Sequence, residues 1–347
     1  MKKAIIFLAL CLCVLAGCGG EKSVSGRVEE VYTDTESEYA PFIIRDSRSD
    51  DKIGIVINSE TYISSRVEID KEEFIKGDFT GAEMTVELGE SVGRLDNKVK
   101  AYIAESIEVK AVICRNVLEL SDGTAVDMRD GPFDIIYQLS DGTELLRVQA
   151  QNSPENVYVV GKESFDDLSE EAKPKVLEFY AEQGLLYGVE RGVEMAYQAY
   201  QSSGEAFQAF YFSQEVGPTA SNERLMYFIT YALIPDDKGN SQELRLGAAF
   251  DRETGEHISD WELFSCSEEE AKKALLNIAQ ISDSGLRAEM DSALLPEYII
   301  FHPDHMEICF PVGTLPSQEY SYVLALEYDE NLRSVLHDWA IPVEMAG

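Results

Sequence analysis

Two of the four histidines stand close enough in the sequence to act together. His302 and His305 flank Pro303-Asp304, so two imidazoles and one carboxylate lie within four residues. These are ligand types that bind zinc, but a zinc site uses three or four ligands and no fourth partner is evident. Pro followed by Asp is also typical of a β-turn. We therefore expect a plain turn here, with no metal and no cofactor.

The cysteines offer little further chemistry. His257 and Cys266 could form a thiol–imidazole pair only if the fold brings them together, and no motif around them supports this. Cys114, Cys266 and Cys309 are widely spaced and odd in number, so they predict neither a disulfide framework nor a metal knuckle. Cys309 lies in an apolar run and is expected to be a buried small hydrophobe. Phosphate-loop and zinc-protease motifs are missing from the sequence, and we expect no catalytic residue.

Acidic side chains dominate the composition. The 64 Asp and Glu residues against 29 Lys and Arg give a net charge of −35. At this density, carboxylate pairs suited to acid–base catalysis arise by chance, and Glu268-Glu269-Glu270 stand where a helix dipole favours acids. The charge disfavours nucleic acid and anionic lipid as partners. It would attract cations or a basic protein, or it serves only to solvate the surface.

A short internal repeat is the next candidate for a functional site. Leu118–Thr124 and Tyr137–Thr143 share the letters Leu-Ser-Asp-Gly-Thr. Asp-Gly between alternating residues is typical of a hairpin turn. Paired acidic loops for calcium are the alternative, but calcium takes six to eight oxygen ligands and each turn offers few. We therefore expect hairpins at Asp122-Gly123 and Asp141-Gly142.

The first eighteen residues predict where the protein works. Lys2-Lys3 precedes an uncharged apolar run, Ala4 to Leu15, which is shorter than the roughly 20 residues of a membrane span. It ends in Leu15-Ala16-Gly17-Cys18, which resembles the lipobox of bacterial lipoproteins. That resemblance implies cleavage before Cys18 and acylation of its thiol, which anchors the chain to membrane lipid. An ordinary secretory signal is the alternative.

The first part of the chain after the signal sequence is predicted to consist mainly of strands. Alternating apolar residues separated by Gly, Asn and Asp predict half-buried strands up to residue 110, with a short helical piece at Asp70–Gly77. Five strands with this helical insert suit a small Greek-key barrel of the oligonucleotide/oligosaccharide-binding (OB) type. The segments also resemble a small β-barrel domain common in secreted bacterial proteins: Gly26–Val28, Phe42–Ile44, Thr61–Ile63, Gly81–Val86 and Ala104–Val109.

The second half mixes helices and strands. Apolar residues three and four apart predict one long helix from near Pro174 to Tyr200, with Gly184, Gly188 and Gly192 along one face. A strand or another backbone should therefore pack closely against that face. A helix broken at Gly184 is the alternative. Strands are expected at residues 207–216, 225–234, 244–250, 298–301, 306–310 and 323–328. Helices are expected from Ser267, with a capping box to Glu270, and over 331–339, while a polar loop should run through Gly285.

From Leu225 to Trp339 the order of segments resembles a bacterial extracytoplasmic domain. That domain occurs in a lysozyme-sensing anti-sigma factor and beside the catalytic part of some peptidoglycan deacetylases. The matching segments are Leu225–Leu233, Leu246–Gly255 leading to Asp260–Phe264, and the hairpin Tyr298–Phe310. The family's Gly-Gly-Ala-His loop is replaced here by Ile234–Asn240. The resemblance implies a binding or sensing module. Tyr298, Tyr320 and Tyr322 are candidate anchors for a partner.

We therefore predict an α+β protein: an N-terminal OB-like barrel, a β-hairpin connector, and a C-terminal antiparallel sheet with packed helices. The expected function is a membrane-anchored extracytoplasmic lipoprotein of the cell envelope that binds or senses without catalysis. Its partner would be a basic protein or a cell-wall ligand. An envelope enzyme acting on wall polymer through acidic residues, or a structural subunit of an envelope complex, are the alternatives. The predicted divisions are 1–18, 24–110, 111–163 and 164–347.

Overall fold

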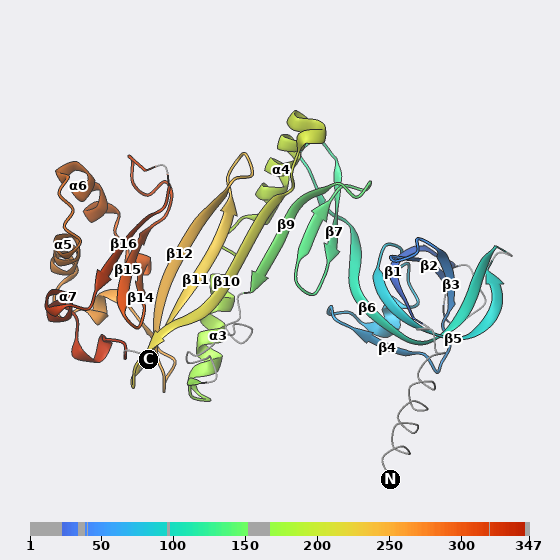
Figure 1. The fold of residues 1–347 in the computed structure, drawn as a ribbon, viewed down its shortest axis with the longest axis horizontal. Helices are drawn as coiled ribbons and strands as arrows, with labels where there is room; N and C mark the ends of the chain where they lie inside the picture. Colours follow the sequence, from blue (N-terminus) through green and yellow to red (C-terminus); the bar gives the residue numbers. More distant parts are fainter. Residues whose placement is uncertain are drawn as a thin grey trace, which may run out of the picture. The chain divides into compact units, whose positions relative to one another are not determined.

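The computed structural model describes residues 23–33, 39, 41–95, 98–151, 167–318 and 320–343 (Figure 1). Cys18 and the signal sequence before it lie outside the described residues. The fold is mixed α+β: a large, mostly antiparallel sheet, a partial ring of strands and a small three-stranded sheet. The chain divides into two compact units, Met1–Ser140 and Asp141–Gly347. Of the helices in the described segments, none has the length and apolar character needed to cross a membrane.

The first unit contains the partial ring. β1 pairs with β2 and β5, β3 with β2 and β6, and β5 with β6, so the strands curve back toward their start. Alternate side chains such as Val28, Ile44 and Val86 fill its core, as the period of two predicts. The elements are β1 (Ser23–Val31), β2 (Phe42–Asp46), β3 (Lys52–Val56), β4 (Tyr62–Ser65), α2 (Lys71–Phe74), β5 (Glu83–Leu95), β6 (Val99–Glu119), β7 (Ala125–Asp130) and β8 (Ile135–Gln138).

β6 is longer than the sequence predicts, because the expected strand ends at Val109 and β6 continues to Glu119. The predicted division at residue 110 therefore falls inside a strand. A bulge at Asn116, where φ is 52°, lets β6 pair with β7 beyond it. Buried Asp127 supports the bulge, because its Oδ1 accepts the Asn116 N–H at 3.0 Å while its Oδ2 pairs with Arg115.

Both copies of the internal repeat form the same local turn. Asp122 Oδ1 accepts the N–H of Thr124 at 2.9 Å, and Asp141 Oδ1 accepts the N–H of Thr143 at 2.9 Å. The following glycine has a φ near 90° in each copy, which favours glycine over other residues. The turn at Asp122-Gly123 joins antiparallel β6 and β7, which confirms the first predicted hairpin. The repeat is therefore a turn motif in which each carboxylate caps its own loop.

The second unit is built on the strands of the large sheet that follow Asp141. β9 and β10 are parallel, and the later neighbours are antiparallel. β11 is buried on both faces, since Tyr227 enters one core and Phe228 the other. The strand expected at residues 207–216 ends later than predicted: β10 continues to Ser221, with a bulge beside Pro218. The strands are β9 (Glu144–Gln151), β10 (Phe210–Ser221), β11 (Leu225–Pro235), β12 (Ser241–Asp251) and β13 (His257–Ile258).

The predicted single helix is two helices, α3 (Ala172–Gln183) and α4 (Val189–Ser203). α3 ends at Gly184, whose φ of 60° leaves the helical region. Buried Gln214 on β10 holds the break: its Nε2 donates to the Gly184 carbonyl at 2.9 Å, and its Oε1 accepts the Leu186 N–H at 2.8 Å. The glycines therefore form no stripe, and only Gly192 is closely approached, by the ring of Tyr187.

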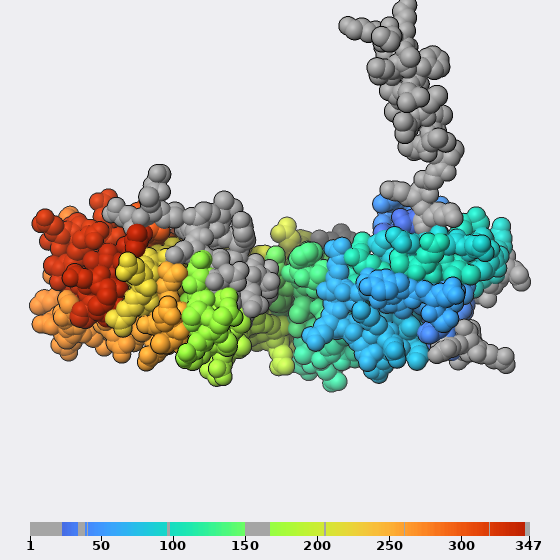
Figure 2. Space-filling view, turned by 90° about the horizontal axis from the view of Figure 1, so that it is seen from below, coloured from blue at the N-terminus to red at the C-terminus, as the bar shows by residue number. Residues whose placement is uncertain are grey.

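The end of the chain adds the three-stranded sheet and three helices to the second unit. Figure 2 shows its yellow, orange and red segments packed side by side. The capping box between Ser267 and Glu270 is confirmed, whereas the predicted polar loop at Gly285 is a helix begun by Asp283. The elements are α5 (Glu268–Ile278), α6 (Ser284–Ala293), β14 (Ile299–Phe301), β15 (His305–Phe310), β16 (Tyr322–Glu327), α7 (Glu330–Val335) and four short 3-10 turns at 204–206, 260–263, 296–298 and 338–340.

Asn222 fastens the last residues of the chain to the sheet. Its Nδ2 donates to the carbonyls of Trp339 and Ile341, both at 3.0 Å. Its Oδ1 accepts the N–H groups of Arg224 at 2.9 Å and Leu225 at 2.8 Å, which closes the β10–β11 turn. One side chain thus joins a turn to a segment more than one hundred residues away.

Candidate functional site

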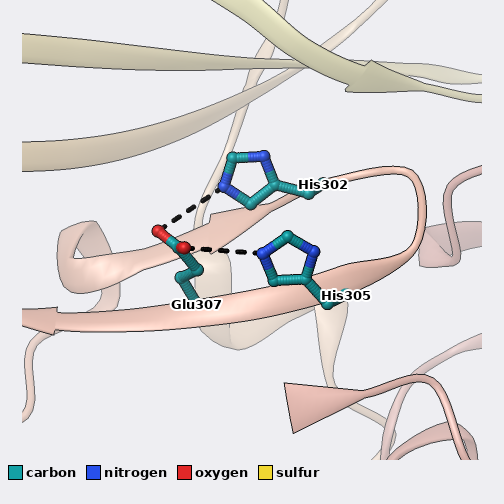
Figure 3. A group of neighbouring side chains, drawn as sticks. All are labelled: His302, His305 and Glu307. Carbon is teal, nitrogen blue, oxygen red and sulfur yellow. Dashed lines mark hydrogen bonds and ion pairs between the residues drawn. The ribbon is translucent and has the colours of Figure 1, made fainter. Parts of the chain in front are cut away.

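The predicted turn between His302 and His305 exists and joins β14 to β15. The His302 N–H donates to the His305 carbonyl at 2.9 Å, and the strands continue antiparallel from this pair. Glu307 lies two residues beyond His305 on β15, so both side chains project from the same face of the strand. Figure 3 shows the Glu307 carboxylate facing both imidazole rings. The hairpin therefore adds a carboxylate that faces both imidazoles.

The three side chains converge closely. Glu307 Oε2 lies 3.6 Å from His302 Nε2, and Glu307 Oε1 lies 3.4 Å from His305 Nε2. One ligand atom from each residue lies within 4.8 Å of the others. The two imidazoles stack, with centroids 4.6 Å apart and planes 11° from parallel. The side chains are 17% to 30% exposed, and Nε2 of His302 is buried within the cluster.

A neighbouring strand contributes a cation. Arg245 on β12 donates to Glu307 Oε2 at 2.9 Å and also pairs with Glu243 at 2.6 Å. The same strand approaches β14 closely at Gly247. A Cβ at position 247 would lie 2.0 Å from the Ile299 carbonyl oxygen. Gly247 and Arg245 are two residues apart, so the close approach and the ion pair occur on one face of β12.

Two further contacts orient the histidines. Asp304 Oδ1 lies 2.7 Å from His305 Nδ1, and because a carboxylate only accepts, Nδ1 carries the hydrogen. The hydroxyl of Tyr328, a largely buried residue, donates to the His302 main-chain carbonyl at 3.1 Å. Asp304 was the carboxylate expected beside the histidines. It instead holds the outer nitrogen of His305 and leaves the facing position to Glu307.

The electrostatics of the cluster favour a charged Glu307. Burial opposes its ionisation, but His302, His305 and Arg245 outweigh burial, so the pKa of Glu307 falls below its usual value. The Asp304 pKa is also lowered, chiefly by its hydrogen bond to His305. Burial, reinforced by Glu307, raises the pKa of the Cys309 thiol to about 12. Cys309 is thus a protonated, buried side chain at neutral pH, as the sequence predicts for a small hydrophobe.

Glu307 is the residue that sequence reasoning missed. The signal for it was present, because His305 and Glu307 stand at positions i and i+2 at the start of an expected strand. We expected that strand to begin at Met306, one residue late. Including His305 would have placed the two side chains on one face.

The environments of His257 and Cys266 do not favour a reactive thiol–imidazole pair. The ring of His257 stacks on Phe179, with centroids 4.8 Å apart, and burial lowers its pKa. Cys266 precedes α5, where burial and Glu270 raise the pKa of its thiol. A nucleophilic thiolate needs a lowered pKa, so this environment does not activate Cys266. Cys114, Cys266 and Cys309 are all free thiols.

The three candidate partner-binding tyrosines differ in how exposed they are. Tyr298 packs beside Phe310 in the core of the second unit. Tyr320 is 79% exposed and Tyr322 is 39% exposed, and Val323 next to them is 40% exposed. Tyr322 and Val323 begin β16, which forms one edge of the three-stranded sheet. The exposed apolar group Tyr320, Tyr322 and Val323 is named the β16 patch below.

The chain has structural similarity to known proteins only at low sequence identity among the matches found. No protein-family model matches the sequence, and a search of curated proteins finds no match. The structure has similarity to a DUF3298 family protein from Pseudomonas aeruginosa, with 12% identity and a TM-score of 0.31, covering 57% of this chain and 87% of that one. A DUF3298 member from Bacteroides fragilis has 11% identity and a TM-score of 0.34, covering 65% and 92%. Scores this low assign neither an activity nor a ligand.

Proposed function

We propose that the protein is a lipoprotein of the cell envelope that binds or senses a partner on the outer face of the membrane. The observation that carries this proposal is the sequence Leu15-Ala16-Gly17-Cys18 after an uncharged apolar run. Acylation of Cys18 would hold the chain to the bilayer, since each buried methylene contributes about 0.8 kcal/mol. The chain is proposed to act by binding rather than by catalysis.

We also propose that residues 24–110 form a small Greek-key barrel of the OB type. The strand pairings of β1 with β2 and β5, and of β3 and β5 with β6, support this topology. The short helix α2 stands between β4 and β5. A helical insert between the strands is what we expect of this type of barrel. The fold type by itself assigns no ligand.

The partner that the charge favours is a basic protein. Cleavage before Cys18 removes Lys2 and Lys3 and no acidic residue, which changes the net charge from −35 to −37. Such a field accelerates encounter with a cationic partner, but specificity needs apolar anchors. The β16 patch supplies two exposed tyrosines and a valine on a sheet edge. A cell-wall ligand is the other partner class that an extracytoplasmic location allows.

The anchor is tested by Cys18→Ser in cells. The variant should leave the membrane fraction or keep its uncleaved mass, because the thiol that accepts the lipid is gone. Cys13→Ser is the matched control, since it makes the same change inside the apolar run and should fractionate like the unaltered protein. Unchanged mass and membrane association of Cys18→Ser would refute the lipoprotein assignment.

The partner is tested by titrating the full chain with lysozyme, a basic protein, in a calorimeter at 0.1 M and 1 M salt. Binding should weaken at high salt, because the Debye length falls from about 10 Å to about 3 Å. Tyr320→Ala and Tyr322→Ala should each weaken binding roughly tenfold, while Tyr62→Ala, which removes an exposed tyrosine on β4, should not. Absence of heat at low salt would exclude lysozyme as the partner.

A further inference from the structure

We propose that His302, His305 and Glu307 form a three-ligand site for a divalent transition metal ion such as Zn²⁺, with an open coordination position toward solvent. This goes beyond the proposed binding function and contradicts the expectation of a plain turn. The turn supplies two imidazoles, and β15 adds the carboxylate that completes a His-His-Glu ligand set. Three such protein ligands with one open position are a recurring arrangement in zinc proteins.

The hydrogen positions show why a cation fits between these groups. His305 Nδ1–H is committed to Asp304, so the neutral ring presents the lone pair of Nε2 toward Glu307. Glu307 Oε1, only 3.4 Å away, also presents lone pairs. Two acceptors at this separation repel unless a proton or a metal ion lies between them.

The distances suit a small ion. Zinc lies about 2.0–2.1 Å from imidazole nitrogen and 2.0–2.2 Å from carboxylate oxygen, so tetrahedral ligand atoms are roughly 3.4 Å apart. The contact between His305 Nε2 and Glu307 Oε1, at 3.4 Å, already has this length, and one ligand atom from each of the three residues lies within 4.8 Å of the others. Binding requires the stacked rings of His302 and His305 to tilt until both nitrogens point at one ion. The partial exposure of both side chains leaves room for that tilt.

The surrounding contacts resemble the outer shell of a metal site. A carboxylate bound to the far nitrogen of a ligating histidine fixes its tautomer and raises its basicity, and Asp304 does this for His305. Tyr328 fixes the main chain of His302. Arg245 binds Glu307 Oε2 and leaves Oε1 to coordinate, while Glu243 balances the arginine's charge.

The test is a calorimetric titration of the full-length protein with Zn²⁺ at pH 7.5, in excess Ca²⁺ to occupy the many surface carboxylates. One Zn²⁺ should bind per chain. His302→Ala, His305→Ala and Glu307→Gln should each weaken binding at least tenfold, and Asp304→Ala should weaken it about 10–100-fold. His337→Ala is the matched control, because it removes a histidine that stacks on Trp339 elsewhere in the unit. Cys309→Ser should leave the affinity unchanged.

A second measurement separates lost binding from lost folding. At a Zn²⁺ concentration a hundred times the Kd, the Tm of the unaltered second unit should rise by about 5–10 °C. Glu307→Gln should fold, as judged by its tryptophan fluorescence, and should show no Zn²⁺-dependent rise. Absence of Zn²⁺ binding at pH 7.5 would overturn the proposal in favour of a proton shared by His305 and Glu307. Equal Zn²⁺ binding by the His302→Ala/His305→Ala double variant would also overturn it.

Affinity should fall at pH 5.5, where protons compete for the imidazoles. A pH-independent affinity would overturn the assignment of histidine ligands. Other charged and titratable groups surround the ligands and affect this competition. On the β14–β15 hairpin they are His302 and Asp304 in the turn, and His305, Glu307 and Cys309 on β15. Neighbouring elements add Glu243 and Arg245 on β12 and Tyr328 after β16.

Discussion

Asn222→Asp should destabilise the second unit strongly, although the two side chains have nearly the same shape. The amide uses all of its hydrogen-bonding capacity, because Nδ2 donates twice and Oδ1 accepts twice. A carboxylate keeps the two accepted bonds and cannot donate. It would place an oxygen 3.0 Å from the carbonyls of Trp339 and Ile341, which turns two attractive contacts into repulsive ones.

The magnitude follows from the two lost donations. Each net hydrogen bond contributes about 1 kcal/mol, and a carbonyl left without its partner costs about 1–3 kcal/mol. We therefore expect the free energy of unfolding to fall by about 2–4 kcal/mol. With a urea m-value of about 2 kcal/mol per molar, the midpoint should fall by about 1–2 M.

Tryptophan fluorescence is the assay of choice, because the only two tryptophans, Trp261 and Trp339, both lie in the second unit. Asn277→Asp is the matched control. Its Oδ1 accepts from Arg287 at 2.7 Å, a role that a carboxylate keeps, so its midpoint should change by less than the equivalent of about 0.5 kcal/mol.

The pH dependence gives a second check on Asn222→Asp. The introduced carboxyl faces two carbonyls, so its pKa should be higher in the folded state than in the unfolded state. The folded state then binds more protons, and stability should rise as the pH falls through the folded pKa. A midpoint equal to that of Asn277→Asp, or one that falls further on acidification, would refute the reasoning.

Three other predictions concern the candidate site. Gly247→Ala should lower the free energy of unfolding by more than about 1 kcal/mol, because its Cβ would meet the Ile299 carbonyl oxygen at 2.0 Å. The urea midpoint measures this change, and an unchanged midpoint would show that β12 and β14 can separate freely. Glu307 has a lowered folded pKa, so its stabilisation should be complete above pH about 4.3 and lost as pH falls through the folded value. Glu307→Gln should flatten that part of an acid-unfolding profile. Cys309, 3% exposed and with a raised pKa, should be the last thiol alkylated at pH 8 in mass-spectrometric mapping, whereas rapid labelling would contradict its burial.

Local patterns in the sequence determined much of the secondary structure. The alternation around Val28 and Ile44, the turn at Asp122-Gly123 and the capping box at Ser267 depend on neighbours within a few residues, so sequence alone predicted them. The acidic composition and the lipobox-like segment ending in Cys18 are likewise properties of the sequence. They carry the proposed location and the proposed partner class.

Only the tertiary structure decided where contacts between distant residues override local preference. The expected long helix is broken at Gly184 because Gln214, thirty residues later, satisfies the freed main-chain groups. The turn at His302 became a candidate metal site because β15 pairing places Glu307 opposite both rings. Arg245 on β12 reaches that carboxylate on β15, and Gly247 lets β12 approach β14 closely. The contacts of Gln214 and Arg245 join residues tens of positions apart, and periodicity within one segment carries no information about them.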